Sequence, residues 1–229
     1  MKNIILLLSL IPLLVLDLGC KSRTRQVDTR NYLEIQKDVM KTLLSLSTDP
    51  AIKNFDLNQD IKTWPGVYRK VNISGHITEL YLNGQQLTGS IPADIEKLTS
   101  LTYLNLSENY YLTGSIPDDI GKLTSLRDLD LSSTKLTGSI PADIGNLTSL
   151  TSLILSRNQL TGSIPDDIGK LINLTNLYLS SNELTGSIPA DIVNLTSLTN
   201  LYLSENKLRG PAPIIANCTV MFEPQNPNP

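Results

Sequence analysis

The residues best suited by type and spacing to acid–base chemistry are two aspartates, Asp128 and Asp130. One residue separates them, so both side chains lie on the same face of an extended segment. Paired carboxylates on one face are the arrangement with which glycosidases cleave their substrates. The apolar segments around this pair are short and supply no deep pocket. A glycan hydrolase is therefore the least favoured interpretation, and we expect no enzyme.

Residues for metal or thiol chemistry are scarce. The chain of 229 residues has two cysteines, Cys20 and Cys218, and one histidine, His76. Zinc sites need several such ligands close together, so we expect no metal and no cofactor. A Cys/His nucleophile pair would have to use His76, and its spacing from either cysteine does not indicate one. The net charge of −3 argues against a nucleic-acid partner.

The segments that must position any functional side chain form an internal repeat. The motif LTGSIP occurs at 87–92 and recurs from Leu112, Leu136, Leu160 and Leu184, which gives a period of 24 residues. One unit carries an extra residue at Tyr110–Tyr111. A fixed period in this range is typical of a solenoid, in which stacked units bury a continuous core. Six units are visible, the last truncated, and they begin at Ile77, Leu101, Leu126, Leu150, Leu174 and Leu198.

The consensus LxxLxLxxN followed by LTGxIPxxIGxL resembles the plant-type class of leucine-rich repeat proteins. The resemblance covers about 77–213 and implies an α/β solenoid. The family's arc has parallel strands on its concave face, a second strand or turn at LTGxIP, and short 3-10 or irregular helices on its convex face. The resemblance also implies that the repeat's asparagine points inward and satisfies backbone groups. Two units carry another residue at this position, Gln85 in one and Thr134 in the other. The four asparagines are Asn109, Asn158, Asn182 and Asn206.

A proline follows each LTGSI segment, and an aspartate comes two residues later. Proline suits the first position of a short helix, where no amide donor is needed. A carboxylate near that end is stabilised by the helix dipole. We prefer this explanation to the alternative that the five aspartates form a row of calcium ligands. The aspartates are Asp94, Asp119, Asp143, Asp167 and Asp191.

Between the inward leucines of each concave strand, side chains face outward in two files. Tyrosine and asparagine dominate these files, as they do in antibody paratopes. We therefore expect a binding protein whose concave face engages a protein or glycan partner, and we expect a monomer. The predicted binding residues are Glu79, Tyr81, Tyr103, Asn105, Asp128, Asp130, Asn176, Tyr178, Asn200 and Tyr202.

Two alternatives remain open. The first is a secreted enzyme inhibitor, because some plant-type repeats resemble inhibitors of wall-degrading enzymes. The other is a binder of a regular surface such as ice, through a file of threonines at 88, 113, 137, 161 and 185.

The first twenty residues predict export. Lys2 precedes an apolar run from Ile4 to Leu16 that is too short for a mature membrane span. Leu18-Gly19-Cys20 resembles the lipobox of bacterial lipoproteins, although Asp17 departs from it. We expect a signal peptide at 1–19, lipidation of Cys20, a tether at 20–30 and a place at the bacterial cell envelope or surface. The alternative is an ordinary secretory signal.

Each end of the array needs a cap. A helical pattern from Asn31 to Ser47 opens a predicted N-terminal cap at 31–76, with Asn31 and Glu34 as a capping pair. Trp64-x-Gly66-Val67 resembles the plant-type cap motif, but Lys62 and Arg69 stand where the family has cysteines. Residues 214–229 predict a C-terminal cap and a frayed tail, with Cys218 as a small buried residue.

Overall fold

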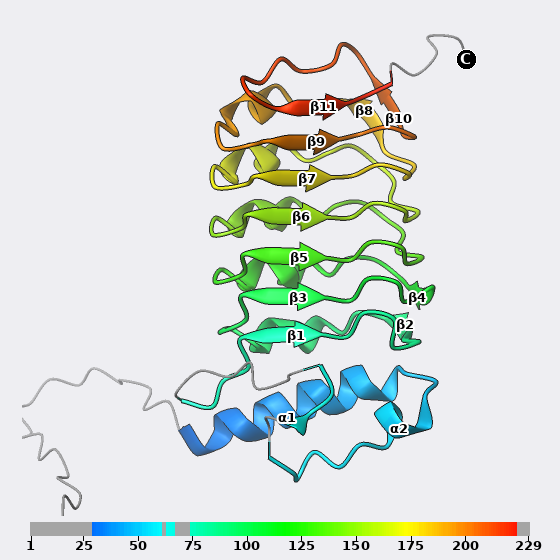
Figure 1. Ribbon diagram of the computed structural model, residues 1–229, viewed down its shortest axis with the longest axis vertical. Helices are drawn as coiled ribbons and strands as arrows, with labels where there is room; N and C mark the ends of the chain where they lie inside the picture. Colours follow the sequence, from blue (N-terminus) through cyan, green and yellow to red (C-terminus); the bar gives the residue numbers. More distant parts are fainter. Residues whose placement is uncertain (1–28, 61–62, 67–73, 224–229) are drawn as a thin grey trace, which may run out of the picture.

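The computed structural model describes residues 29–60, 63–66 and 74–223 of the chain (Figure 1). A helical segment lies at one end, and repeated coils stack upon it in sequence order (Figure 1). Each coil contributes one strand to a common parallel sheet and, on the opposite side, one short helix. This architecture confirms the predicted α/β solenoid.

In the described part of the chain, the main sheet has seven parallel strands in the order β1-β3-β5-β6-β7-β9-β11. Equivalent positions of neighbouring coils pair directly, so that Leu104 lies opposite Leu129 and Leu153 opposite Leu177. The strands are β1 (Glu79–Tyr81), β3 (Tyr103–Asn105), β5 (Asp128–Asp130), β6 (Ser152–Ile154), β7 (Asn176–Tyr178), β9 (Asn200–Tyr202) and β11 (Thr219–Met221).

A second ladder forms at the LTGSIP segments. It contains two short parallel pairs, β2 (Thr88–Ser90) with β4 (Tyr111–Thr113), and β8 (Thr185–Ser187) with β10 (Lys207–Arg209). Between these pairs, isolated parallel bridges join Ser115 to Thr137, Ser139 to Thr161 and Ser163 to Thr185.

Within the described residues, five 3-10 helices line the side opposite the main sheet. They are η2 (Ala93–Lys97), η3 (Asp118–Lys122), η4 (Ala142–Asn146), η5 (Asp166–Lys170) and η6 (Ala190–Asn194). The prediction that a proline would occupy the first position of each helix is wrong by one residue. Pro141, for example, is the N-cap of η4, with extended backbone angles of φ −66° and ψ 141°. The ring still suits this place because it fixes φ.

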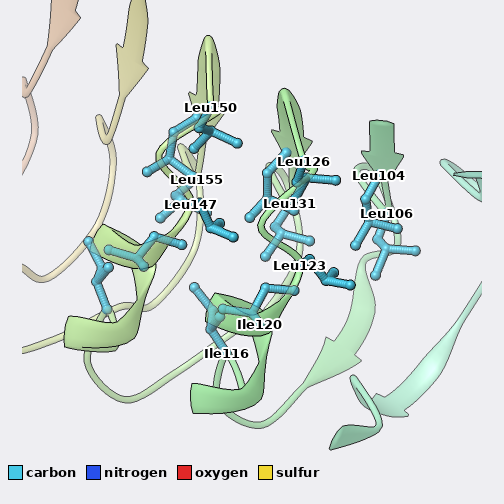
Figure 2. Close-up of a cluster of buried hydrophobic side chains, with 14 of the residues drawn as sticks. Leu104, Leu106, Ile116, Ile120, Leu123, Leu126, Leu131, Leu147, Leu150 and Leu155 are labelled. Atoms are coloured by element: carbon cyan, nitrogen blue, oxygen red, sulfur yellow. The ribbon is translucent and has the colours of Figure 1, made fainter. Parts of the chain in front are cut away.

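The core lies between the main sheet and the 3-10 helices. Figure 2 shows Leu126 and Leu131, which flank β5, pointing toward Ile120 and Leu123 of the opposite side. All four side chains are fully buried. Because aliphatic side chains from adjacent coils share one interior, each coil depends on its neighbours for burial.

Among the described residues that precede β1, the α-helices are α1 (Thr29–Ser45) and α2 (Pro50–Lys53). Helix α1 begins two residues before Asn31, so the predicted capping role of Asn31 is wrong. Val39 and Leu43 of α1 are buried in the core, as is Trp64. The glycine of the cap motif, Gly66, has a φ of +79°, and a Cβ there would lie 2.6 Å from the Tyr81 carbonyl oxygen.

The C-terminal end contains a strand that sequence analysis did not predict. Strand β11 pairs in parallel with β9, and Val220 lies opposite Leu201. Cys218 is half-buried against the core rather than fully buried, and burial raises the pKa of its thiol.

Candidate functional site

The concave face is the outer surface of the main sheet, made by the residues on either side of each central leucine. One file contains Glu79, Tyr103, Asp128, Ser152, Asn176 and Asn200, and the other contains Tyr81, Asn105, Asp130, Ile154, Tyr178 and Tyr202. Every member is partly exposed, whereas the leucine between each pair is buried. The main sheet thus brings all ten predicted binding residues onto one surface.

Stacked tyrosines lie on both halves of this surface. Tyr81 and Tyr103 stack with ring centroids 4.5 Å apart, and Tyr178 and Tyr202 stack at 4.6 Å. The Tyr81 hydroxyl donates to Glu79 Oε2 at 2.6 Å, and this bond is the main reason that the pKa of Tyr81 rises to about 12. Stacking and hydrogen bonding hold these rings in defined positions before any ligand arrives.

The polar side chains are also held in place. Asn105 Oδ1 accepts hydrogen bonds from the amide and hydroxyl of Ser107, and Asp130 Oδ1 accepts the same pair from Ser132. In the C-terminal half, the side-chain amide of Asn200 donates to Asn176 Oδ1 at 2.8 Å. Such local bonds fix side-chain direction, which lowers the entropy that binding must remove.

A shallow depression of about 350 Å³ lies beside β5 and is lined by Glu79, Thr102, Tyr103, Arg127 and Asp128. Loss of hydration raises the pKa of Asp128, while the Thr151 hydroxyl and Arg127 oppose the shift. Asp128 and Asp130 are both partly exposed on either side of the buried Leu129.

The asparagines of the repeat lie inside the turn that follows each concave strand. Asn158 Nδ2 donates to the carbonyls of Leu131 and Leu155, and Asn158 Oδ1 accepts from the Leu136 amide. Asn109 and Asn182 make equivalent bonds, and Asn206 does the same beneath the last complete coil. Each asparagine thus joins its own coil to the preceding one.

The two substitutions in this series behave differently. The Thr134 hydroxyl donates to Leu131 O and to Asn158 Oδ1, so it remains part of the buried network. Gln85 instead turns outward and donates to Asn83 O, while Ser47 from the N-terminal cap donates to the Gln85 carbonyl.

The threonines of LTGSIP lie on the second ladder and are exposed from the second unit onward. The bridges pair the serine of one coil with the threonine of the next, as in Ser139 with Thr161. Consequently, threonines of successive coils are offset by two residues along the strand rather than lying abreast.

The aspartates of the 3-10 helices take part in local contacts. Lys97, Lys122 and Lys170 form ion pairs with the aspartate three residues earlier in their own helices. Asp143 accepts a hydrogen bond from the side-chain amide of Asn146 at 3.1 Å. Over the described ranges, no group of three or more His, Cys, Asp or Glu residues is placed to hold a metal ion.

Two exposed features were not assigned to the surface by sequence analysis. The extra residue in the second unit leaves Tyr110 and Tyr111 exposed by 59% and 63%, with Lys135 Nζ 5.2 Å from the Tyr111 ring centroid. Strand β11 extends the two files with Thr219 and Met221. The insertion was visible in the sequence, but β11 has no repeat signature.

Other predicted features fall outside the described residues. These are the signal peptide, Cys20, the start of the tether, and the cap positions Lys62, Val67 and Arg69. Among the helices that the structure describes, none has the length and apolar character needed to span a bilayer.

Comparison with known proteins adds an independent observation. A family model described as a leucine-rich repeat region matches residues 76–201. No curated protein sequence matches the chain.

Many solved structures share its fold, among them three of plant proteins. The ectodomain of the Arabidopsis thaliana receptor kinase GASSHO1/SCHENGEN3, in complex with CASPARIAN STRIP INTEGRITY FACTOR 2, is 35% identical over 82% of this chain, with a TM-score of 0.72. This chain spans only 23% of that ectodomain. The Arabidopsis BIR3–SERK2 complex gives 35% identity over 80% of this chain and 96% of the other, at a TM-score of 0.62. A plant ice-binding protein is 35% identical over 79% of this chain and 57% of its own chain, with a TM-score of 0.69.

Proposed function

The chain belongs to the leucine-rich repeat family, and from this premise we propose that it is a non-enzymatic binding protein. Its concave face engages a protein or glycan partner at the cell envelope or surface. The observation that carries this proposal is the pair of outward files, in which stacked tyrosines and fixed amides form one continuous surface. The similar structures of GASSHO1/SCHENGEN3 in complex with CASPARIAN STRIP INTEGRITY FACTOR 2 and of the BIR3–SERK2 complex support a binding role.

The shape of the surface favours binding over catalysis. Asp128 and Asp130 lie on a short strand, and the depression beside Asp128 is open rather than enclosed. Enzymes gain most of their acceleration from preorganised groups in sites that exclude water. A broad surface with tyrosine contacts instead suits recognition of a macromolecule.

A triple variant tests the concave face. Asp128→Lys, Asp130→Lys and Tyr178→Ala together should abolish capture of the partner by immobilised protein, from cell-surface extract or from a glycan array. The matched control carries Asp118→Lys, Asp166→Lys and Ile172→Ala, which change exposed residues elsewhere on the solenoid. Equal capture by the wild type and the concave variant would refute the proposal.

We further propose that the chain is exported and lipid-anchored through Cys20. The apolar run from Ile4 to Leu16 and the lipobox-like Leu18-Gly19-Cys20 support this. Intact-mass analysis of protein from its native membrane should give an acylated chain that begins at Cys20. An unmodified chain cleaved elsewhere would instead indicate an ordinary secreted protein.

A second candidate function is binding to a regular surface such as ice. The exposed threonines of the second ladder and the similarity to a plant ice-binding protein favour it. Thr137→Val and Thr161→Val should leave the fold intact but would reduce ice binding if this ladder were the site, and replacing both with Lys should abolish it. A thermal-hysteresis measurement on the wild-type chain tests this candidate directly. Absence of thermal hysteresis would rule out ice binding as the function.

A further inference from the structure

We propose that the ligand of the concave face is an extended basic polypeptide segment that runs across the strands. This inference deepens the proposed function and rests on it. Arginine or lysine side chains of the segment lie at Asp128 and Asp130, and its other side chains contact the two tyrosine stacks.

The first argument is the uneven distribution of charge. All charged members of the two concave files are acidic, namely Glu79, Asp128 and Asp130. Several lysines are placed elsewhere, where they pair with acidic side chains of the 3-10 helices and with Glu183 before β8. The two concave files therefore carry acidic but no basic side chains, and Arg127 lines the depression next to Asp128.

The second argument concerns the surroundings of the two aspartates. In the part of the chain that the structure describes, neither Asp128 nor Asp130 forms an ion pair. Arg127 lines the depression but does not offset the loss of hydration, since the pKa of Asp128 is still raised. A cation from a ligand would supply the missing partner, and a guanidinium suits a carboxylate especially well because it can donate two parallel hydrogen bonds.

The third argument is the position of the tyrosines. Tyr81 and Tyr103 flank the acidic centre on one side, and Tyr178 and Tyr202 lie beyond Ser152 and Ile154 on the other. Tyrosine faces attract guanidinium and ammonium groups and also take flat peptide units. The tyrosine stacks and the carboxylates therefore both suit a basic peptide.

The spacing of these features matches an extended chain. From β3 to β7 there are three strand steps, which at about 4.8 Å each amount to roughly 14 Å. A fully extended polypeptide advances about 3.3–3.6 Å per residue, so four or five residues bridge the two tyrosine stacks. A residue about one third of the way along such a segment, counted from β3, then lies above β5, where Asp128 and Asp130 are.

A glycan fits these observations less well. A neutral glycan cannot compensate the two carboxylates, and an acidic glycan is repelled by them. A basic peptide alone uses the charge, the aromatic stacks and the length of the surface together.

The test is selection of random twelve-residue peptides displayed on phage against the full chain. Enriched peptides should be rich in arginine and lysine. Their synthetic forms should bind about tenfold or more weakly to the Asp128→Asn/Asp130→Asn variant, which is a change of about 1.4 kcal/mol. Binding should also weaken as salt rises from low to physiological concentration. The control variant Asp118→Asn/Asp166→Asn removes two exposed charges outside the concave face and should bind as the wild type does.

Other outcomes separate this inference from the proposed function. Peptides without basic bias that still lose binding on Tyr178→Ala would overturn the basic ligand and leave the concave face as the site. Peptides bound equally by all variants would overturn both. Failure to enrich any peptide would overturn the basic ligand, and glycan capture sensitive to Tyr178→Ala would then preserve the concave site.

Discussion

Asn158 Oδ1 accepts a hydrogen bond from the backbone amide of Leu136 at 3.0 Å, although the two residues belong to successive coils. The same side chain donates to Leu131 O and Leu155 O, at 2.9 and 3.1 Å. One buried amide therefore satisfies backbone groups of two coils where the chain turns away from the concave face. Coil stacking depends on this contact as well as on leucine burial.

Replacing this side chain should destabilise the protein. Asn158→Ala leaves the Leu136 amide without its acceptor, and we expect a loss of about 1–3 kcal/mol. Urea unfolding followed by circular dichroism measures it. Gln159→Ala removes an exposed side chain next to it and should change stability little. If both variants unfold at the same urea concentration as the wild type, the structural role of Asn158 is wrong.

Glycines on the convex side set how closely the 3-10 helices approach. A Cβ at Gly145 would lie 2.5 Å from the Asp167 carbonyl oxygen of the next coil. Gly145→Ala should therefore cost about 1–3 kcal/mol, because backbone must move. Val193 occupies the equivalent position in the last repeat helix and is 54% exposed. Val193→Ala is the matched control, and thermal melting of both variants should show a large shift only at Gly145.

Asp128 should make stability depend on pH. Its pKa is raised in the folded protein, chiefly by loss of hydration, so ionisation favours the unfolded chain. The folded state therefore loses stability as pH rises from the unfolded value of 3.8 through the raised folded value. Asp128→Asn should increase the melting temperature at pH 7, and the gain should disappear below pH 3.8. A lower melting temperature at pH 7 would contradict this explanation.

Much of the fold follows from the sequence because the repeat is regular. The LxLxxN spacing places leucines inward and adjacent residues outward, and parallel pairing without offset follows from stacking equal units. Tyr178 and Tyr202 occupy the same repeat position, so their proximity could be predicted. The asparagine positions were also apparent from the period.

Other features needed three-dimensional structure because no local pattern encodes them. Tyr81 and Tyr103 occupy different repeat positions, and only the diagonal geometry of neighbouring strands brings their rings together. Strand β11 lacks the LxxLxL spacing, and it is recognised only by its parallel pairing with β9, in which Val220 lies opposite Leu201. The two-residue offset between Thr137 and Thr161 likewise appears only in the pairing of the second ladder, where Thr161 lies opposite Ser139.

The central claim is that the concave face binds the partner, and hydroxyl-radical footprinting of tyrosines tests it most directly. The chain offers an internal comparison, because Tyr178 and Tyr202 lie on the concave face whereas Tyr110 and Tyr111 are exposed outside its files. With the partner bound, we predict reduced oxidation of Tyr178 and Tyr202 and unchanged oxidation of Tyr110 and Tyr111. Protection of Tyr110 and Tyr111 alone, with the concave tyrosines as reactive as in the free protein, would contradict the account.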